Sequence, residues 1–370
     1  MHFSFKRREL KKLYPLTISR GTYGSSENLF VTIGHEGLSG IGELAPAESK
    51  GWTCESGERQ LRKFLQEGGL SIRCEGAERE ILILVCVEDT YDFVNRFSVQ
   101  QTWERMREAG IDPPAMAALD VALWDLHAKR AGLPLFSLFG LSPRSKPTSL
   151  TIGLNPPEIT RERVPEILSR TRAKFLKIKL GSPAGREYDK AHFEAAREAS
   201  APFKVGLRVD ANGGWTPDEA VMMIAWLAER GVEYVEQPLV DGGEDGLPYV
   251  FERRKLPIFI DESCRFSQDV AKFAHCVDGV NLKLMKCGGL TEAMRIVATA
   301  KAHGLKTMIG CMGESSVAIA AGASIGSLFD YIDLDSHLNL DPDCASGIWF
   351  HDGVLMPRDV PGHGAQLCDA

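Results

Sequence analysis

Strand-like apolar segments recur about every 25 residues from residue 148 onward, and a helix-like segment follows most of them. Segments such as 217–231 and 291–304 repeat apolar residues at helical spacing, with an N-capping residue before them and Gly near their end. The pattern predicts strands at 148–154, 175–180, 204–210, 232–236, 257–261, 279–284, 306–311 and 329–335. Eight strands alternating with helices are typical of an α/β fold with a closed parallel barrel. A doubly wound open sheet is less favoured, because no GxGxxG motif follows the first strand.

The first 140 residues have a different pattern. Two apolar runs flank the turn "HEGL" at 35–38 and predict a hairpin, and residues 113–132 predict a helix that begins with Pro and ends with Gly. Leu119, Leu123 and Leu126 share one face of that helix. We therefore predict an α+β module over residues 1–140, a barrel over 141–340, and a return of residues 341–370 to the first module.

Composition narrows the class of protein. Of the 370 residues, 44% are hydrophobic and 25% are charged, and the net charge of −7 argues against nucleic acid or an anionic membrane as a partner. The longest aliphatic run, "ILILVCV" at 81–87, is too short to cross a bilayer, and the chain start does not resemble a signal peptide. The nine cysteines are scattered and form no CxxC pair, which suits a reducing cytoplasm. We expect a cytoplasmic protein.

Ionisable residues stand at the predicted carboxyl ends of successive strands, where barrel enzymes place their chemistry. Asp210, Glu236 and Asp261 end three consecutive strands, roughly one barrel unit apart. Three converging carboxylates repel one another unless a cation lies between them, and an all-oxygen set with open positions suits Mg²⁺. The sequence therefore predicts a magnesium site; single strand-end acids could instead cap helices.

Lysines accompany these carboxylates. Lys177 and Lys179 alternate onto the same face of one strand, and Lys283 stands at the end of a strand on the other side of the acids. Neighbouring cations should lower the pKa of such a lysine towards that of a general base, so one lysine could remove a proton and the other return it to the opposite face. The alternative is that these lysines only pair with the carboxylates. Lys286 lies beyond its strand and reads as a surface or salt-bridging residue.

At these residues the sequence resembles the enolase superfamily, specifically its muconate-lactonizing-enzyme-like subgroup. "DANGGW", "VEQPL", "DES", "NLKLMKCGGL" and "VPGHGAQL" all look like subgroup motifs and occur in one order along nearly the whole chain. The resemblance implies a (β/α)7β TIM-type barrel under an N-terminal α+β capping domain. It also implies Mg²⁺ on the three acids, Lys179 and Lys283 as the acid/base pair, and Lys177 near the substrate carboxylate. The His–Asp dyad of the mandelate-racemase subgroup has no counterpart at the matching positions.

Within the subgroup the sequence is similar to dipeptide epimerases of the L-Ala-D/L-Glu epimerase type. "IDLDSHL" matches their DxD motif, so Asp333 and Asp335, predicted on one strand face, could hold the free α-ammonium of a dipeptide. The resemblance of "GCMGES" places Cys311 and Gly313 beside the dipeptide backbone, with Thr151 also lining the pocket. The implied reaction inverts the α-carbon of the C-terminal residue by 1,1-proton transfer through a metal-stabilised enolate.

The sequence alone does not decide which substrate side chain the site prefers. Arg20 matches a loop arginine that in Ala-Glu epimerases meets a side-chain carboxylate, whereas Glu27, Glu48 and Glu55 could favour a cation. Residues 74–94 depart from the family pattern. The alternative functions are those of an N-acylamino-acid racemase, an o-succinylbenzoate synthase or a cycloisomerase of the same subgroup. A barrel that binds a metal or a carboxylated ligand without catalysis is a further alternative. We expect His337 to be a surface residue, Cys311 not to be a nucleophile, and the protein to form a homo-oligomer, as is usual for the family.

Overall fold

Eight parallel strands form one sheet in the computed structural model, which describes all residues except 1, 48–49, 68–70, 75–79, 84–97 and 369–370. They neighbour one another in chain order: β6 Ser149–Ile152, β7 Phe175–Lys179, β8 Gly206–Asp210, β9 Val232–Glu236, β10 Ile258–Ile260, β11 Gly279–Lys283, β12 Lys306–Gly310 and β13 Tyr331–Asp333. A parallel bridge between Thr148 and Ile332 joins the two ends of the sheet, so the barrel nearly closes. The predicted fold class is confirmed.

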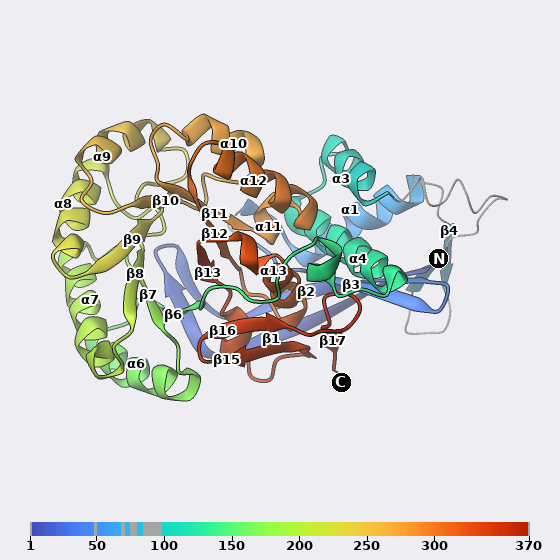
Figure 1. The fold of residues 1–370 in the computed structure, drawn as a ribbon, viewed down its shortest axis with the longest axis horizontal. Helices are drawn as coiled ribbons and strands as arrows, with labels where there is room; N and C mark the ends of the chain where they lie inside the picture. The colour runs from blue at the N-terminus through green and yellow to red at the C-terminus, as the bar shows by residue number, and fades with distance from the viewer. Residues whose placement is uncertain (1, 48–49, 68–70, 75–79, 84–97, 369–370) are drawn as a thin grey trace.

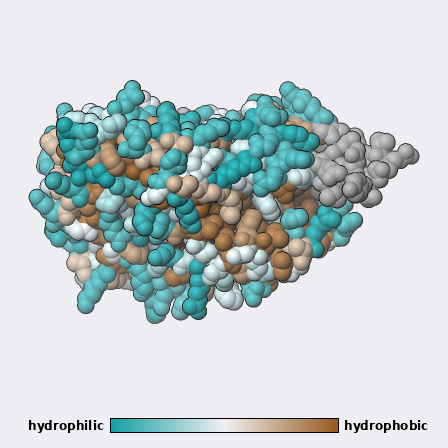
Figure 2. Space-filling model, turned by 45° about the horizontal axis from the view of Figure 1, so that its top comes forward, coloured by the Kyte–Doolittle hydropathy of each residue, from teal (hydrophilic) through white to brown (hydrophobic). Residues whose placement is uncertain are grey.

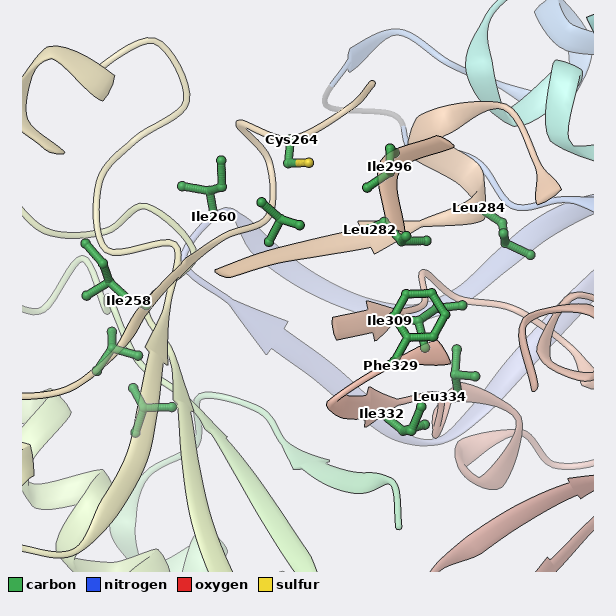
Figure 3. Packing of buried hydrophobic residues seen from close by; sticks show 14 of the residues in the cluster. Ile258, Ile260, Cys264, Leu282, Leu284, Ile296, Ile309, Phe329, Ile332 and Leu334 are labelled. Carbon is green, nitrogen blue, oxygen red and sulfur yellow. The ribbon is translucent and has the colours of Figure 1, made fainter. Parts of the chain in front are cut away.

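Helices cover the outside of this barrel, and Figure 1 shows α6 to α9 along its outer side. Their bounds are α6 Pro157–Thr171, α7 Arg186–Ser200, α8 Pro217–Ala228, α9 Leu247–Arg253, α10 Ser267–Phe273, α11 Leu284–Cys287, α12 Leu290–Ala302 and α13 Ser316–Ser324. Strand alternation creates the core between the two layers, because residues such as Ile258, Ile260 and Leu282 point towards the helices (Figure 3). Residues between them along each strand point into the barrel.

Aromatic rings fill the barrel one layer below the predicted site. The rings of Tyr234, Phe259 and Tyr331 pack with centroids 4.9 to 5.4 Å apart. The buried guanidinium of Arg208 lies 3.6 Å from the Phe175 ring centroid and beside these rings. Since Arg208, Tyr234 and Tyr331 each precede a predicted site residue by two positions, they form the floor beneath it.

An antiparallel sheet of order β3-β2-β1-β5-β4 forms the first module. Its strands are β1 His2–Ile18, β2 Gly21–His35, β3 Leu38–Leu44, β4 Ser71–Cys74 and β5 Glu80–Ile83, and the module's helices are α1 Cys54–Glu67, α3 Val99–Glu108, α4 Pro113–Ala131 and α5 Leu135–Leu138. Strand β3 packs directly on α4: a Cβ on Gly42 would stand 2.0 Å from the Ala118 carbonyl oxygen, and one on Gly40 2.1 Å from that of Ala122. Glycine at both positions therefore allows the sheet to approach the helix.

The C-terminal segment runs back to this module. It contains η5 Ser336–Asn339, β14 Ala345–Ser346, β15 Ile348–His351, β16 Val354–Pro357 and β17 Gln366–Leu367. The His363 backbone N–H donates to Asp125 on α4, and Arg8 of β1 donates to the Cys368 carbonyl. These contacts agree with the expected return, while the division at residues 140 and 340 stays a prediction.

Two remaining features of the fold are the molecular surface and residues 74–94, which depart from the family pattern. Figure 2 shows one face covered mostly by hydrophilic side chains, with apolar ones gathered towards its lower middle. Among the described residues, no helix is long and apolar enough to cross a membrane. Of the segment at 74–94, Cys74 ends β4 and Glu80–Ile83 form β5, and the rest lies outside the described residues.

Candidate active site

Three buried carboxylates meet at the carboxyl ends of β8, β9 and β10. Asp210 and Glu236 are paired in the strand register, and Asp261 comes directly after β10. One carboxylate oxygen from each lies within 4.8 Å of the others. Because the set is all oxygen and converges on one point, it fits a hard divalent cation such as Mg²⁺. The structure brings the three predicted metal ligands together.

Lys179 and Lys283 flank this triad from β7 and β11. The Lys179 Nζ lies 2.5 Å from Asp210 Oδ2, and the Lys283 Nζ lies 2.7 Å from Asp261 Oδ2. The side chains are 10% and 9% exposed, so both ammonium groups are held in place yet can still be reached. Two lysines on opposite sides of a carboxylate cluster can exchange a proton with a carbon acid bound between them.

Lys177 occupies the centre of the barrel mouth with no exposed surface. Its Nζ lies 2.6 Å from Glu236 Oε2, 2.6 Å from Asp333 Oδ2 and 3.4 Å from Asp210 Oδ2. Lys177 therefore holds oxygens of three carboxylates together at the centre of the site.

The pKa values of the site residues are shifted by burial and by the ion pairs between the lysines and the carboxylates. Burial, reinforced by repulsion from Asp210, raises the pKa of Glu236 to about 8. Burial also acts to raise the pKa of Asp261, but Lys283 and Lys286 outweigh it and hold that pKa well below its usual range. Burial would lower the pKa of Lys283, yet Asp261 outweighs it and raises that pKa above its ordinary value. The fall in lysine pKa expected beside a bound divalent cation stays a prediction; without the cation, the directly paired carboxylate of Asp261 outweighs burial at Lys283.

The residues expected beside the dipeptide backbone meet at the seam between β6, β12 and β13. Asp335 Oδ2 accepts a 2.6 Å hydrogen bond from the Thr151 backbone N–H, and the Cys311 thiol lies 4.0 Å from Asp335 Oδ1. Burial and repulsion from Asp333 raise the pKa of Asp335 to about 6. The carbonyl of Gly313 accepts from Asn28 on β2, which ties this loop to the capping module.

Asp333 and Asp335 do not share one strand face as predicted. Strand β13 ends at Asp333, and Asp335 has helical backbone angles (φ −111°, ψ −5°). Strand alternation therefore stops before Asp335, and Asp333 points to Lys177 instead. Asp335 nevertheless remains near the site through its bond to Thr151.

A cavity of about 470 Å³ leads from the triad to the capping module. It reaches Asp261 and Lys283 on the barrel side and is lined on the other by cap residues that include Ser19, Arg20 and Trp52. Its other uncharged lining includes Ala47, Pro183, Val240 and Met312. A ligand with one end at the triad would therefore extend towards the cap.

Comparison with known proteins agrees with this geometry. The family model for the enolase C-terminal domain-like fold matches residues 160–370, and the model for the N-terminal domain of mandelate racemase and muconate lactonizing enzyme matches residues 88–140. A hydrophobic dipeptide epimerase from Roseobacter litoralis is 54% identical over 98% of this chain and 97% of its own length. The chain belongs to the dipeptide epimerase family of the enolase superfamily.

Two further relatives support the assignment. A hydrophobic dipeptide epimerase from a Flavobacteria bacterium is 51% identical over 99% of this chain and 98% of its own. The structure of a dipeptide epimerase from Enterococcus faecalis, in complex with Mg and L-Leu-L-Tyr, is 30% identical and superposes with a TM-score of 0.83 over 98% of each chain. The predicted resemblance to dipeptide epimerases is confirmed.

Two minor predictions concern Lys286 and His337. Of the two alternatives for Lys286, the structure has the salt-bridging one: the residue is buried, its Nζ lies 2.5 Å from Asp261 Oδ1, and it donates to the carbonyls of Asp261, Cys264 and Asn281. It thus anchors a metal-ligand carboxylate from behind. The prediction that His337 is a surface residue is wrong. His337 is also buried, and burial lowers its pKa to about 4.

Cap residues predicted to choose the substrate differ in their positions. Arg20 lines the cavity, whereas Glu27 and Glu55 are exposed and do not, and Glu48 lies outside the described residues. Four other residues line the cavity that the sequence did not indicate: Trp52, Val240, Met312 and Glu262. They come from loops that meet only in the folded chain, so neither their spacing nor a position at the end of a predicted strand points to them.

Proposed function

We propose that this protein is a Mg²⁺-dependent dipeptide epimerase that inverts the α-carbon of the second residue of dipeptides with apolar side chains. The observation that carries the proposal is the placement of Lys179 and Lys283 on opposite sides of the acidic triad, with Lys283 and Asp261 lining the inner end of the cavity. Such a pair can take a proton from one face of a carbon and return one to the other.

Each residue of the site then has a role. The triad of Asp210, Glu236 and Asp261 would hold Mg²⁺, which supplies positive charge next to the substrate carboxylate and so makes the α-proton more acidic. Lys177 adds its charge to the same region while it holds Glu236 and Asp333 in place.

Proton transfer uses the two flanking lysines. One of Lys179 and Lys283, as the neutral amine, takes the α-proton onto its Nζ, and the other, as the ammonium, gives a proton to the opposite face of the same carbon. The net charge of the pair is unchanged, and the stereocentre is inverted. The reverse reaction exchanges their roles.

Recognition of a free amine is the role of two carboxylates at and just after the end of β13. Asp333 and Asp335 offer negative charge near Thr151 and Cys311, where the α-ammonium of a dipeptide would lie. An N-acylated amino acid carries no such charge, so in an N-acylamino-acid racemase Asp333 would keep only Lys177 and Asp335 would meet no cation of the substrate.

The apolar preference rests on the cavity and on the relatives. Ala47, Trp52, Pro183, Val240 and Met312 contribute uncharged lining, and Val240 is 60% exposed at its edge. The relatives above 50% identity are named for hydrophobic dipeptides. The cytoplasmic location and the homo-oligomeric state remain predictions from the sequence.

A substrate panel tests the proposal. Purified enzyme with Mg²⁺ is incubated with L-Ala-L-Leu, L-Leu-L-Tyr, L-Ala-L-Glu, L-Ala-L-Lys and N-succinyl-L-Leu, and the epimers are separated by chiral chromatography. The proposal predicts turnover of the apolar dipeptides above all others. Turnover of N-succinyl-L-Leu alone would make the protein a racemase, and no turnover of any of them would favour a binding protein.

A further inference from the structure

Arg20, at the turn between β1 and β2, is paired with a barrel residue inside the cavity. Its Nη2 lies 2.6 Å from Glu262 Oε1, and its Nη1 donates to the Asn212 carbonyl at 3.1 Å. The Ser19 hydroxyl donates to the same carbonyl at 3.0 Å. The turn is thus fixed onto residues that neighbour the metal ligands Asp210 and Asp261.

Glu262 has a second link to the metal ligands. The Asn212 side chain lies 3.5 Å from Glu262 Oε1 and 3.2 Å from Asp210 Oδ2, and the Asn212 backbone N–H donates to Asp210. The Glu262 side chain is 13% exposed, so its charge is poorly solvated without Arg20. Glu262 therefore needs Arg20 as long as no ligand charge replaces it, whereas the more exposed guanidinium of Arg20 also meets solvent.

The other charged residues of the cavity lining form two groups. One group lies at the acidic triad, and the other consists of Asp241, Lys50 and Arg265. Asp241 is shared by Lys50 and Arg265, both 36% exposed, so solvent and salt screen the excess positive charge there. Between that group and the triad, the charges of Arg20 and Glu262 cancel, and Trp52, Val240 and Met312 carry none.

We propose that the Arg20–Glu262 pair makes the cavity selective for uncharged side chains on the second residue of the dipeptide; this inference rests on the proposed function. An acidic side chain would have to compete with Glu262 for the Arg20 guanidinium, and displacement of Glu262 would leave a half-buried carboxylate unpaired beside Asp261. A cationic side chain would have to displace Arg20 from Glu262 in the same way. Charged side chains are thus rejected because either one breaks a pair that an apolar side chain leaves intact.

Variants that remove one charge of the Arg20–Glu262 pair at a time test the proposal. Arg20→Met, Glu262→Gln, the double variant and wild type are compared by kcat/KM for L-Ala-L-Leu, L-Ala-L-Glu and L-Ala-L-Lys. Glu198→Gln, which removes the acid of an exposed arginine–glutamate pair (Arg161–Glu198, 3.4 Å) on the outer helices, is the matched control. Ratios between substrates are compared, since Glu262 stands next to a metal ligand and its loss could lower all rates together.

Opposite changes in preference are expected. Glu262→Gln frees Arg20 and should raise the Glu/Leu ratio by ~tenfold or more, and Arg20→Met frees Glu262 and should raise the Lys/Leu ratio by a similar factor. The double variant and the control should keep the wild-type ratios. If Glu262→Gln does not fold, the Arg20→Met ratio alone decides.

Two results would overturn the inference while the proposed function stands: apolar turnover with unchanged ratios in both single variants, or a wild-type preference for L-Ala-L-Glu that Arg20→Met removes. The second result would make Arg20 a receptor for a substrate carboxylate. Failure of wild type to epimerise any dipeptide would overturn the proposed function and the inference together.

Discussion

Lys177 holds Asp333 at 2.6 Å and thereby joins β7 to β13 across the mouth of the barrel. The same ammonium lies 2.6 Å from Glu236 Oε2, and all three groups are buried. Burial alone would lower the pKa of Lys177, but Asp333 and Glu236 outweigh it and raise that pKa well above its ordinary value. Lys177 therefore stays positively charged, and its charge stabilises the buried carboxylates of Asp333 and Glu236.

Loss of this charge should destabilise the protein. Lys177→Met leaves buried Asp333 and Glu236 without their cation, and breaking one partner of a buried ion pair costs about 3–5 kcal/mol. Urea unfolding in the presence of a chelator measures the difference from wild type. Lys190→Met, which removes the half-buried partner of the exposed Glu187, is the control and should change the free energy of unfolding far less than Lys177→Met does. An equally small effect of Lys177→Met would contradict the central role of this residue.

Removal of either flanking lysine should stop epimerisation but not all proton exchange. With Lys179→Ala or Lys283→Ala, one face of the α-carbon loses its proton carrier, so kcat for inversion should fall by about 10²–10⁴. Each variant should still exchange the α-proton of one stereoisomer with solvent, and the two variants should act on opposite stereoisomers. NMR in D₂O with separate L,L and L,D dipeptides follows this exchange. A variant with near-normal inversion would remove its lysine from the mechanism.

Mg²⁺ should stabilise the folded protein through the acidic triad. A ligand at one hundred times its Kd adds about 2.7 kcal/mol to the free energy of unfolding, which raises Tm by several degrees. Glu236→Gln should abolish that rise and weaken Mg²⁺ binding in calorimetry, whereas Glu198→Gln should keep both. The same rise in Tm with Glu236→Gln would place the metal elsewhere.

Asp335 should matter most for substrates with a free amine. Asp335→Asn removes a carboxylate that would meet the α-ammonium, so kcat/KM for L-Ala-L-Leu should fall by at least tenfold more than that for any slow reaction of the N-acetyl analogue. Parallel assays of both compounds supply the ratio. Equal losses would show that Asp335 supports the fold of the site and does not recognise the amine.

His337 should make the protein sensitive to acid. Burial lowers its pKa to about 4 from an ordinary value near 6.5, so the unfolded chain binds the proton first as pH falls. The contribution of His337 to stability is therefore complete above pH ~6.5 and is lost as pH falls towards 4, by up to roughly 3 kcal/mol.

A single variant isolates this effect. Neither ring nitrogen of His337 has a hydrogen-bond partner among the described residues, so His337→Leu loses no such bond. Its free energy of unfolding should fall less than that of wild type between pH 6.5 and 4, as urea titrations at several pH values would show. Identical pH dependence would mean that His337 is charged or solvated in the folded state.

Strand-end residues of the site could be predicted from sequence because their positions depend on local rules. Alternation within "FLKIKL" places Lys177 and Lys179 on one face, and the barrel repeat brings Asp210 and Glu236 to the same level. Both rules apply to any regular parallel strand, and the structure follows them.

Residues beyond the strands could not be predicted in this way. Asp335 follows the end of β13, where alternation no longer applies, and Lys286 is turned back onto Asp261 by the short helix α11. The contact between Arg20 and Glu262 joins residues 242 positions apart and exists only once the cap lies on the barrel. Sequence alone could therefore name Arg20 but not its partner.

The most direct test of the two-lysine account is deuterium incorporation during one turnover. L-Ala-L-Leu is incubated with wild-type enzyme and Mg²⁺ in D₂O, and the L-Ala-D-Leu formed early in the reaction is isolated and analysed by mass spectrometry and NMR. The account predicts one deuterium at the α-carbon of the inverted leucine and none elsewhere, with no reaction after chelation. Inversion with full retention of the original α-proton, or no inversion of any dipeptide, would contradict it.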